Sequence, residues 1–303
     1  IMSDSTFNIL SFDGGGIRGA LSIKLLEKIQ NETPNIVKKS NMISGTSTGS
    51  LIALGLAYGM TPSEISNLYS KENLEYIFDK SYSQISRPKY DNNHLKEILL
   101  SVFPENLKLK DLGKLVVIPT FYVGNEYNSW KAIFYNNLPN SETEDYRVVD
   151  VAMASSAAPV FFPSYDCHID GGIIATDPSL ASIIYSIDEE LGKRMDQIRL
   201  LSFGTGYCYN SIKVDTSKWG AIDWVISKDP DLPIISVTLE GNAQLSQIFS
   251  KKLLDSNYYR VNPKMDKDIS MDDTKSMDYL LELAEEYNIK DCINWINNKW
   301  NKI

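Results

Sequence analysis

The sequence has 303 residues, of which 43% are hydrophobic and 23% charged, and its net charge is −9 at pH 7. This length allows one large α/β domain or two small ones, and the acidic balance argues against a nucleic-acid polymer as the main partner. No apolar run approaches the ~20 residues that span a bilayer, and the N-terminus lacks the basic flank and apolar core of a signal peptide. We therefore expect a cytoplasmic protein, with any membrane contact peripheral, or one exported without a cleaved signal.

The sequence favours neither a disulfide framework nor a metal site. Cys167, Cys208 and Cys292 are odd in number and scattered, which indicates free thiols in a reducing compartment. No group of His and Cys has zinc spacing. The acidic residues Asp266, Asp268, Asp272 and Asp273 lack the glycine and glutamate of a calcium loop, so a solvated face is expected there and no cofactor is predicted.

A short buried strand followed by a glycine turn comes first in the chain. Residues 8–12 are mostly apolar, a helical pattern runs over 19–30, and between them lies Asp13-Gly14-Gly15-Gly16-Ile17-Arg18-Gly19. Glycines leave their N–H groups unshielded, and a helix N-terminus adds the positive end of its dipole. This turn is therefore a candidate site for negative charge, either a bound anion or one that develops during a reaction.

The same order of strand, glycine turn and helix occurs again about thirty residues later. Residues 41–44 read as a strand, residues 51–57 as a helix that is apolar on all sides, and between them lies Gly45-Thr46-Ser47-Thr48-Gly49. Two such units indicate an α/β fold with a parallel sheet. Gly-x-Ser-x-Gly is the nucleophile-elbow pattern, in which flanking Gly45 and Gly49 allow a sharp turn that exposes the hydroxyl of Ser47.

The remaining elements follow from hydrophobic periodicity and turn residues. A helix is predicted to begin at Pro62, and another spans 93–103. An antiparallel hairpin is predicted at 115–123 and 130–135, a short helix at 149–154, a strand at 166–170, a helix at 180–191 and a buried strand at 198–203. The rest is mostly helical, at 221–227, 234–254, 277–287 and 289–299, with an extended piece at 258–261. With no repeat or linker, we expect a single domain over 1–303, with 206–303 as a helical extension packed on the core.

A serine nucleophile needs a base, and three residues are candidates. His94 begins an amphipathic helix, which favours a solvated or capping role. His168 lies in the strand at 166–170 and could complete a triad if a partner acid were near. Asp170 ends the same strand and precedes Gly171-Gly172, and a carboxylate at such a turn can act as a base if burial raises its pKa.

Four motifs in order resemble the patatin-like phospholipase family. In chain order they are Asp13 to Gly19, Gly45 to Gly49, Ala154-Ser155-Ser156-Ala157-Ala158-Pro159 and Asp170-Gly171-Gly172. The resemblance covers residues 8–205 and implies an αβα sandwich around a mostly parallel sheet. It also implies a metal-independent hydrolase of acyl esters of lipids, in which Ser47 is the nucleophile and Asp170 the base.

The resemblance further implies that Gly14, Gly15 and Gly16 form an oxyanion hole and that Arg18 fixes their loop, although Arg18 could instead form a surface salt bridge. Asp13 is expected to hold its own turn through backbone N–H groups. Where the family often has glycine outside the elbow, this chain has Ser44 and Ser50. Both are small enough to preserve the turn.

Several features allow a functional or a purely structural interpretation. Residues 159–163 could form the wall of an acyl channel or belong to the core, and Tyr76-Ile77-Phe78 with Tyr82 could form a lid. Acyl transfer to an acceptor other than water is an alternative reaction. A further alternative is an effector phospholipase switched on by a nucleotide or a protein, which residues after Gly206 could bind. The expected substrate is a phospholipid or other acyl lipid at a membrane surface.

Overall fold

The central sheet is made of the strands that the hydrophobic pattern predicts, five of them parallel and two antiparallel. In the computed structural model, which describes residues 5–79, 87–227 and 232–300, the sheet has seven strands in the order β4-β3-β2-β1-β6-β7, with β5 also paired to β3. These strands are β1 (Phe7–Phe12), β2 (Met42–Gly45), β3 (Leu115–Tyr122), β4 (Lys131–Asn136), β5 (His168–Asp170), β6 (Ile198–Phe203) and β7 (Tyr258–Val261).

The pairing is parallel across β3, β2, β1, β6 and β7, whereas β4 and β5 run antiparallel to β3. The predicted hairpin is thus confirmed as β3 and β4. The predicted strand at 166–170 is shorter than expected, because Asp166 and Cys167 have φ of 46° and 57°. Residues in this left-handed region form a turn, so β5 begins only at His168.

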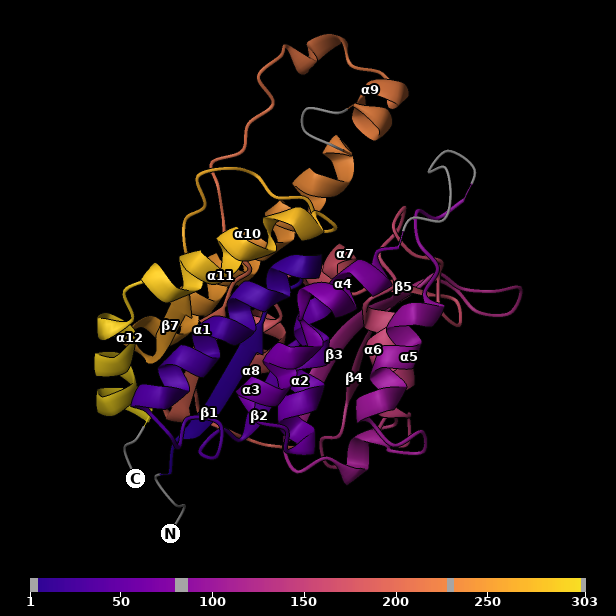
Figure 1. The fold of residues 1–303 in the computed structure, drawn as a ribbon. Coiled ribbons are helices and arrows are strands. Elements are labelled where there is room, and N and C mark those ends of the chain that lie inside the picture. The colour runs from indigo at the N-terminus through magenta and orange to yellow at the C-terminus, as the bar shows by residue number, and fades with distance from the viewer. Residues whose placement is uncertain (1–4, 80–86, 228–231, 301–303) are drawn as a thin grey trace.

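Helices cover both faces of the sheet, which gives the predicted three layers (Figure 1). They are α1 (Gly19–Glu32), α2 (Thr48–Tyr58), α3 (Pro62–Leu68), α4 (Lys71–Ile77), α5 (Asn93–Val102), α6 (Val148–Ser155), α7 (Gly172–Ala175), α8 (Ser179–Ile187), α9 (Ala221–Ile226), α10 (Pro233–Leu254), α11 (Met277–Glu286) and α12 (Lys290–Trp295). Helix α8 is shorter than the predicted helix at 180–191, since Asp188 takes an extended conformation and ends it.

Alternating residues of the strands feed two separate cores, as expected for a sheet buried on both faces. Leu10, Ile43 and Leu201 face the larger core with α1, α2, α6 and α11. Ile9, Met42 and Leu200 face a smaller core that includes Ile183 of α8 and Leu254 of α10. Residues 52–57 of α2 are all buried, in keeping with a helix that is apolar on all sides.

The segment after Gly206 contributes to all three layers. β7 extends the sheet beside β6, α10 packs against α7 and α8, and α11 packs against α1. Trp300 near the C-terminus is 1% exposed. Its indole Nε1 donates to the Ile36 carbonyl at 3.2 Å, and its own carbonyl accepts from Asn8 Nδ2 at 3.1 Å. These contacts favour one folding unit that includes residues 206–303.

Truncation of Trp300 tests this expectation. We expect Trp300→Ala to lower the free energy of unfolding by about 3–5 kcal/mol, because it removes a fully buried aromatic side chain and its hydrogen bond. Urea denaturation measures the change. Trp130→Ala is the matched control, since Trp130 is 75% exposed and should change stability by less than about 0.5 kcal/mol. Equal effects of the two variants would show that the C-terminal end does not stabilise the fold.

Candidate active site

Ser47 occupies a strained turn between β2 and α2. Its backbone has φ 54° and ψ −123°, a conformation that is costly for a residue with a side chain and that occurs mainly at functional sites. Two glycines make the turn possible. A Cβ on Gly45 would lie 1.9 Å from the Gly49 carbonyl oxygen, and a Cβ on Gly49 would lie 2.3 Å from that of Phe12. The elbow therefore has the tight geometry that its sequence predicts.

Ser155 at the end of α6 supports the elbow. The N–H of Ser47 donates to Ser155 Oγ at 3.0 Å, and the Ser155 hydroxyl donates to the Pro119 carbonyl of β3 at 2.8 Å. On the other side, a Cβ on Gly14 would lie 3.4 Å from Ser47 Cβ. The glycine-rich turn after β1 thus packs directly against the serine. Three of the four sequence motifs meet at this one residue.

Asp170 reaches the same point from β5. Along β3, Val117 pairs with Ser44 of β2, and Thr120, three residues further, pairs with Asp170. The carboxyl ends of β2 and β5 therefore approach each other along one edge of β3. Asp170 therefore ends a strand, as its sequence predicts, and this strand runs antiparallel to β3.

The Asp170 carboxyl is 6% exposed and has two polar neighbours. Gly172 N–H donates to its Oδ1 at 2.7 Å. Burial raises the pKa of Asp170 to about 6, although hydrogen bonds from the Ser47 hydroxyl and the Gly172 N–H act to lower it. The two side chains are thus close enough to interact. A carboxylate with this pKa is ionised at neutral pH and is a stronger base than an ordinary aspartate.

The N–H groups of the glycine-rich turn differ in their hydrogen bonds. The N–H of Gly14 donates to the Thr176 carbonyl at 2.9 Å, and its carbonyl accepts from Thr205 Oγ1 at 3.2 Å. By contrast, no described residue accepts a hydrogen bond from the N–H groups of Gly15 and Gly16. The three glycines predicted as donors therefore differ, because Gly14 is already engaged.

Arg18 and Asp13 stand at the two ends of this turn. Arg18 is half buried, and its Nε lies 3.5 Å from the Gly15 carbonyl, which is a contact with the turn. The expectation for Asp13 is wrong. Its carboxylate does not bind its own turn but pairs with Arg260 of β7, with Arg260 Nη2 2.5 Å from Asp13 Oδ2. Backbone N–H groups of the turn alone would not offset the cost of burying this carboxylate. A cation from a distant part of the chain compensates its charge instead.

The hydrogen bonds of the two histidines go to residues other than Ser47. His168 Nε2 is hydrogen-bonded to the Tyr135 hydroxyl at 3.1 Å and its Nδ1 to the Asp166 carbonyl at 2.6 Å. His94 Nδ1 contacts the Tyr76 carbonyl at 2.7 Å, and its ring stacks on Tyr76. Both imidazoles are thus occupied by other groups, which favours Asp170 among the three candidate bases.

An apolar cavity of about 60 Å³ opens beside Ser47. Its lining includes Phe161 and Phe162 from the predicted channel wall, Ile77 and Phe78 from the predicted lid, and side chains of α2 and α5. Tyr82, the other predicted lid residue, lies outside the described residues. The volume is that of about two water molecules, so a long acyl chain would enter only after lining side chains move.

Residues from the last third of the chain complete the site, and sequence reasoning missed them. The Ile17 N–H donates to the Met271 carbonyl at 2.9 Å, and Met271 also lines the cavity. In α10, Asn242 accepts from the Thr176 N–H and donates to the Gly172 carbonyl, both at 2.7 Å. A single methionine or asparagine in a helical or irregular stretch gives no sequence signal for such a role.

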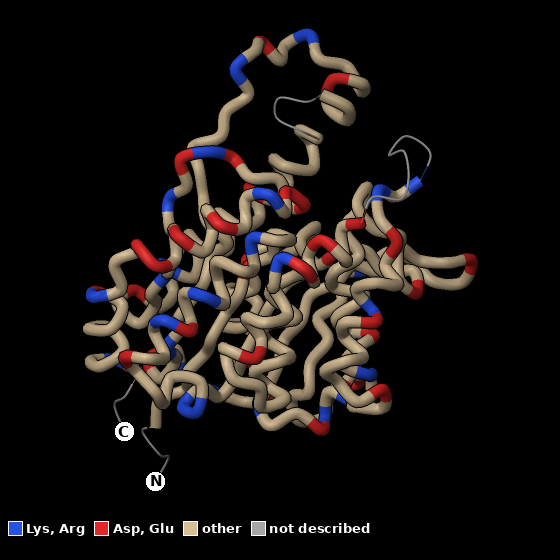
Figure 2. Tube along the Cα trace, viewed as in Figure 1, with Lys and Arg blue, Asp and Glu red and all other residues tan. Residues whose placement is uncertain are grey.

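Charges elsewhere are mixed. Lysines and arginines alternate with acidic residues over the outer helices and loops (Figure 2).

In the described segments, no three His, Cys, Asp or Glu side chains come together as a metal site. Asp272 of the acidic run instead pairs with Lys89 and accepts from the Tyr90 hydroxyl at 2.6 Å. The described cysteines are free. Among the helices of the described chain, none has the length and apolar character to cross a membrane.

Several known proteins are similar to this chain in sequence. The chain is 29% identical to Protein teg of Priestia megaterium, over 97% of this chain and 99% of that protein. It is 28% identical to the putative sporulation hydrolase CotR of Bacillus subtilis, over 97% and 98%. It is also 29% identical to the cGAMP-activated phospholipase of Vibrio cholerae, over 65% and 63%. The family model described as "Patatin-like phospholipase" matches residues 10–181, more than half of the chain, and this protein therefore belongs to the patatin-like phospholipase family.

Proposed function

We propose that this protein is a lipid acyl hydrolase of the phospholipase A type that works through Ser47 and Asp170. The observation that carries the proposal is the convergence of four features. The Ser47 hydroxyl, the buried Asp170 carboxylate and the unengaged amides of Gly15 and Gly16 come from different parts of the chain. Ser47 and Gly16 both line an apolar cavity, and Asp170 accepts a hydrogen bond from the Ser47 hydroxyl, which supports a common site. Membership of the family supports lipid ester hydrolysis as the reaction class.

In the first half of the reaction, Ser47 Oγ attacks the ester carbonyl carbon and Asp170 accepts the hydroxyl proton. The tetrahedral intermediate collapses when the C–O bond to the alcohol breaks, and Asp170 returns the proton to the departing alkoxide. An acyl-enzyme remains. In the second half, Asp170 takes a proton from water and the hydroxide attacks the acyl carbon. The bond from that carbon to Ser47 Oγ then breaks, Asp170 returns the proton to Oγ, and the fatty acid leaves. The carboxylate thus serves as base and acid in turn.

The oxyanion that forms in each half needs donors that are already in place. The amides of Gly15 and Gly16 are the proposed donors, and each is worth roughly 3–4 kcal/mol of barrier by precedent. The engaged peptide of Gly14 serves instead to fix the turn against Ser47. Arg18, which contacts the Gly15 carbonyl at 3.5 Å, restrains the far end of the donor pair.

A regulated form of the same activity is the second candidate. One relative is named a cGAMP-activated phospholipase, and the cavity beside Ser47 has a volume of only about 60 Å³. Both observations support a protein that needs a nucleotide or a partner protein for full activity. Hydrolysis of phospholipid vesicles by the purified chain, measured with and without a cyclic dinucleotide, separates a constitutive from a regulated enzyme. An added alcohol acceptor separates hydrolysis from acyl transfer by the ratio of fatty acid to new ester.

Replacement of the nucleophile is the direct test. We expect Ser47→Ala to lose labelling by a fluorophosphonate probe and to reduce fatty-acid release by about 10⁴-fold or more, as for other serine hydrolases. Mass spectrometry of the labelled peptide and of the lipid products measures both. Ser63→Ala, at an exposed position of α3, is the control and should behave as the wild type. Retained activity in Ser47→Ala would refute the mechanism.

The raised pKa of Asp170 predicts an opposition between stability and activity. Because the folded-state pKa of about 6 exceeds the ordinary 3.8, the folded state loses stability as pH rises between these values, by about 1.4 kcal/mol per pH unit. Asp170→Asn should therefore be inactive yet more stable than the wild type by about 2–3 kcal/mol at pH 8. Urea denaturation at several pH values measures this gain, which should disappear below pH 3.8.

Asp145→Asn is the control for this measurement. Asp145 is on the surface, and hydrogen bonds from Lys110 and Lys108 lower its pKa to about 2. Its replacement should give no gain at pH 8. A wild-type stability that does not change relative to Asp170→Asn between pH 4 and pH 8 would contradict the assignment of a raised pKa to Asp170.

The cavity predicts how chain length is selected. Ile98 of α5 lines it, and Ile98→Trp should fill its far part. Each CH₂ group of the acyl chain that is buried contributes about 0.8 kcal/mol. If the tryptophan excludes two such groups, kcat/KM for long-chain esters should fall by about tenfold relative to a butyrate ester. Leu100→Trp, on the outer side of the same helix where Leu100 is 40% exposed, is the control. The same chain-length profile in both variants would remove this cavity as the acyl site.

A further inference from the structure

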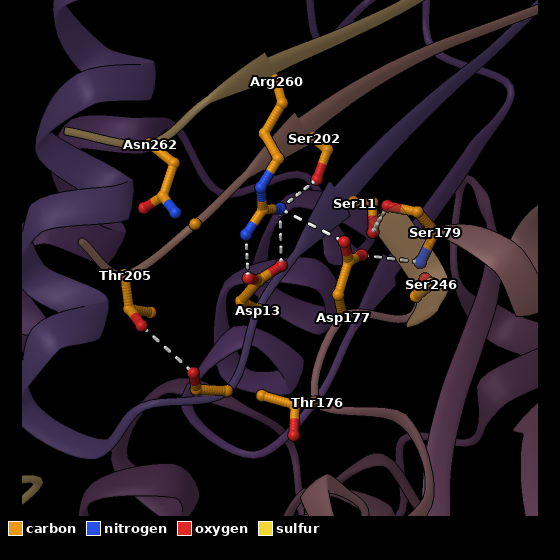
Figure 3. A network of polar contacts seen from close by, with 12 residues as sticks. Ser11, Asp13, Thr176, Asp177, Ser179, Ser202, Thr205, Ser246, Arg260 and Asn262 are labelled. Atoms are coloured by element: carbon orange, nitrogen blue, oxygen red, sulfur yellow. Dashed lines mark hydrogen bonds and ion pairs between the residues drawn. The ribbon is translucent and has the colours of Figure 1, made fainter. Parts of the chain in front are cut away.

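Arg260 of β7 is the centre of a buried polar network behind the glycine-rich turn (Figure 3). Its Nη2 lies 2.5 Å from Asp13 Oδ2, and its Nη1 lies 3.2 Å from Asp13 Oδ1 and 3.2 Å from Asp177 Oδ2. Nη1 also donates to Ser202 Oγ of β6 at 2.6 Å. The side chains of Arg260, Asp13 and Asp177 are 14%, 6% and 0% exposed. One guanidinium thus joins two carboxylates and a neighbouring strand away from solvent.

The two carboxylates belong to the two segments that the proposed chemistry must hold together. Asp13 is the first residue of the turn that carries the Gly15 and Gly16 amides. Asp177 directly follows Thr176, whose carbonyl accepts from the Gly14 N–H at 2.9 Å. The same segment begins at Asp170, and Thr46 Oγ1 of the elbow donates to its Ala175 carbonyl at 2.6 Å. Arg260 therefore links the amide turn to the segment that bears the proposed base.

Three consecutive glycines cannot hold their own position, because they have no side chains to pack and the widest backbone freedom. Their placement depends on the residues at either end of the turn. At one end, Asp13 is held by Arg260. At the other, the Ile17 N–H is held by the Met271 carbonyl at 2.9 Å. Both partners come from the segment after Gly206, for which the sequence analysis finds no motif.

The charges in the network require an arginine at this position, and a lysine could not replace it. Burial and the negative charge of Asp177 raise the pKa of Asp13 to about 7, against the opposing effect of Arg260. Burial alone would lower the pKa of Arg260, but Asp13 and Asp177 more than offset it and raise it. A lysine could neutralise one carboxylate, but it lacks the planar fork of donors that reaches Asp13, Asp177 and Ser202 together.

We propose that Arg260 is a positioning residue for the reaction: with Met271, it clamps the glycine-rich turn so that the Gly15 and Gly16 amides keep a fixed relation to Ser47 and Asp170. This inference rests on the proposed function for its catalytic consequence. It assigns the segment after Gly206 a part in the active site, since the anchor at each end of the turn lies in that segment. Arg260 itself touches no reacting atom.

The test compares Arg260→Lys with Val261→Ala. Val261 is the next residue of β7, is fully buried and packs in the larger core, so its truncation destabilises the same strand without touching the network. We expect Arg260→Lys to lower kcat on a soluble short-chain ester by about 10²-fold, the effect of a displacement near 1 Å, with KM changed less than about threefold. Val261→Ala should keep kcat within about twofold at temperatures below its unfolding transition.

A second variant and a second measurement cover a failure of Arg260→Lys to fold. Asp177→Asn keeps the acceptor for the Ser179 N–H, now 2.9 Å from Asp177 Oδ1, and leaves the pair of Arg260 and Asp13 intact. It should lower kcat by about tenfold. Hydrogen exchange followed by mass spectrometry should show faster exchange in peptides spanning residues 13–18 and 171–177 in the network variants, and wild-type exchange there in Val261→Ala.

The outcomes separate this inference from the proposed function. Unchanged kcat and unchanged exchange in Arg260→Lys and Asp177→Asn would overturn the clamp, as would an equal loss of kcat in Val261→Ala. Absence of fluorophosphonate labelling at Ser47 in the wild type would instead refute the proposed function. In that case the exchange measurement still decides whether Arg260 orders the turn.

Discussion

The site depends on the strained backbone of Ser47. A residue with a side chain at φ 54° and ψ −123° persists only where its surroundings fix it. Here Gly45 and Gly49 let three backbone segments approach within contact of each other, and Ser155 takes the Ser47 N–H. This tight packing directs the hydroxyl out of the elbow, and it brings β2, the turn after β1 and the end of α6 to one point. Without it, neither the amides nor the carboxylate would have a common target.

The site also contains buried carboxylates whose local hydrogen bonds do not offset the cost of burying their charge. Asp170 and Asp13 are both nearly inaccessible, and burial raises the pKa of each, to about 6 and about 7. The fold treats the two differently. Asp13 and Asp177 share Arg260, which makes them structural. Asp170 is paired with no cation among the described residues and receives only the hydrogen bonds from Ser47 and Gly172. In our proposal this unneutralised carboxylate is the base for the neighbouring Ser47 hydroxyl, and its cost in stability is typical of a catalytic group.

Much of this arrangement could be predicted from local sequence, because glycine patterns and hydrophobic periodicity report local backbone needs. The elbow, the turn after β1, the hairpin of β3 and β4 and the long helix α10 follow from residues that are neighbours in the chain. The contacts that could not be predicted join distant residues: Arg260 to Asp13, Asn242 to Thr176 and Met271 to Ile17. The antiparallel direction of β5 was missed for the same reason, since strand direction depends on which partner the strand meets. The left-handed turn at Asp166 and Cys167 has no glycine to mark it.

The most direct measurement of the central claim is a crystal structure of the protein after reaction with a small fluorophosphonate. The phosphonyl group copies the tetrahedral intermediate, so its free oxygen takes the place of the oxyanion. Our account predicts phosphorus bonded to Ser47 Oγ, with that oxygen about 2.7–3.1 Å from the amides of Gly15 and Gly16 and Asp170 beside the ester oxygen. A phosphonyl oxygen directed away from both amides, or an adduct on a residue other than Ser47, would contradict it.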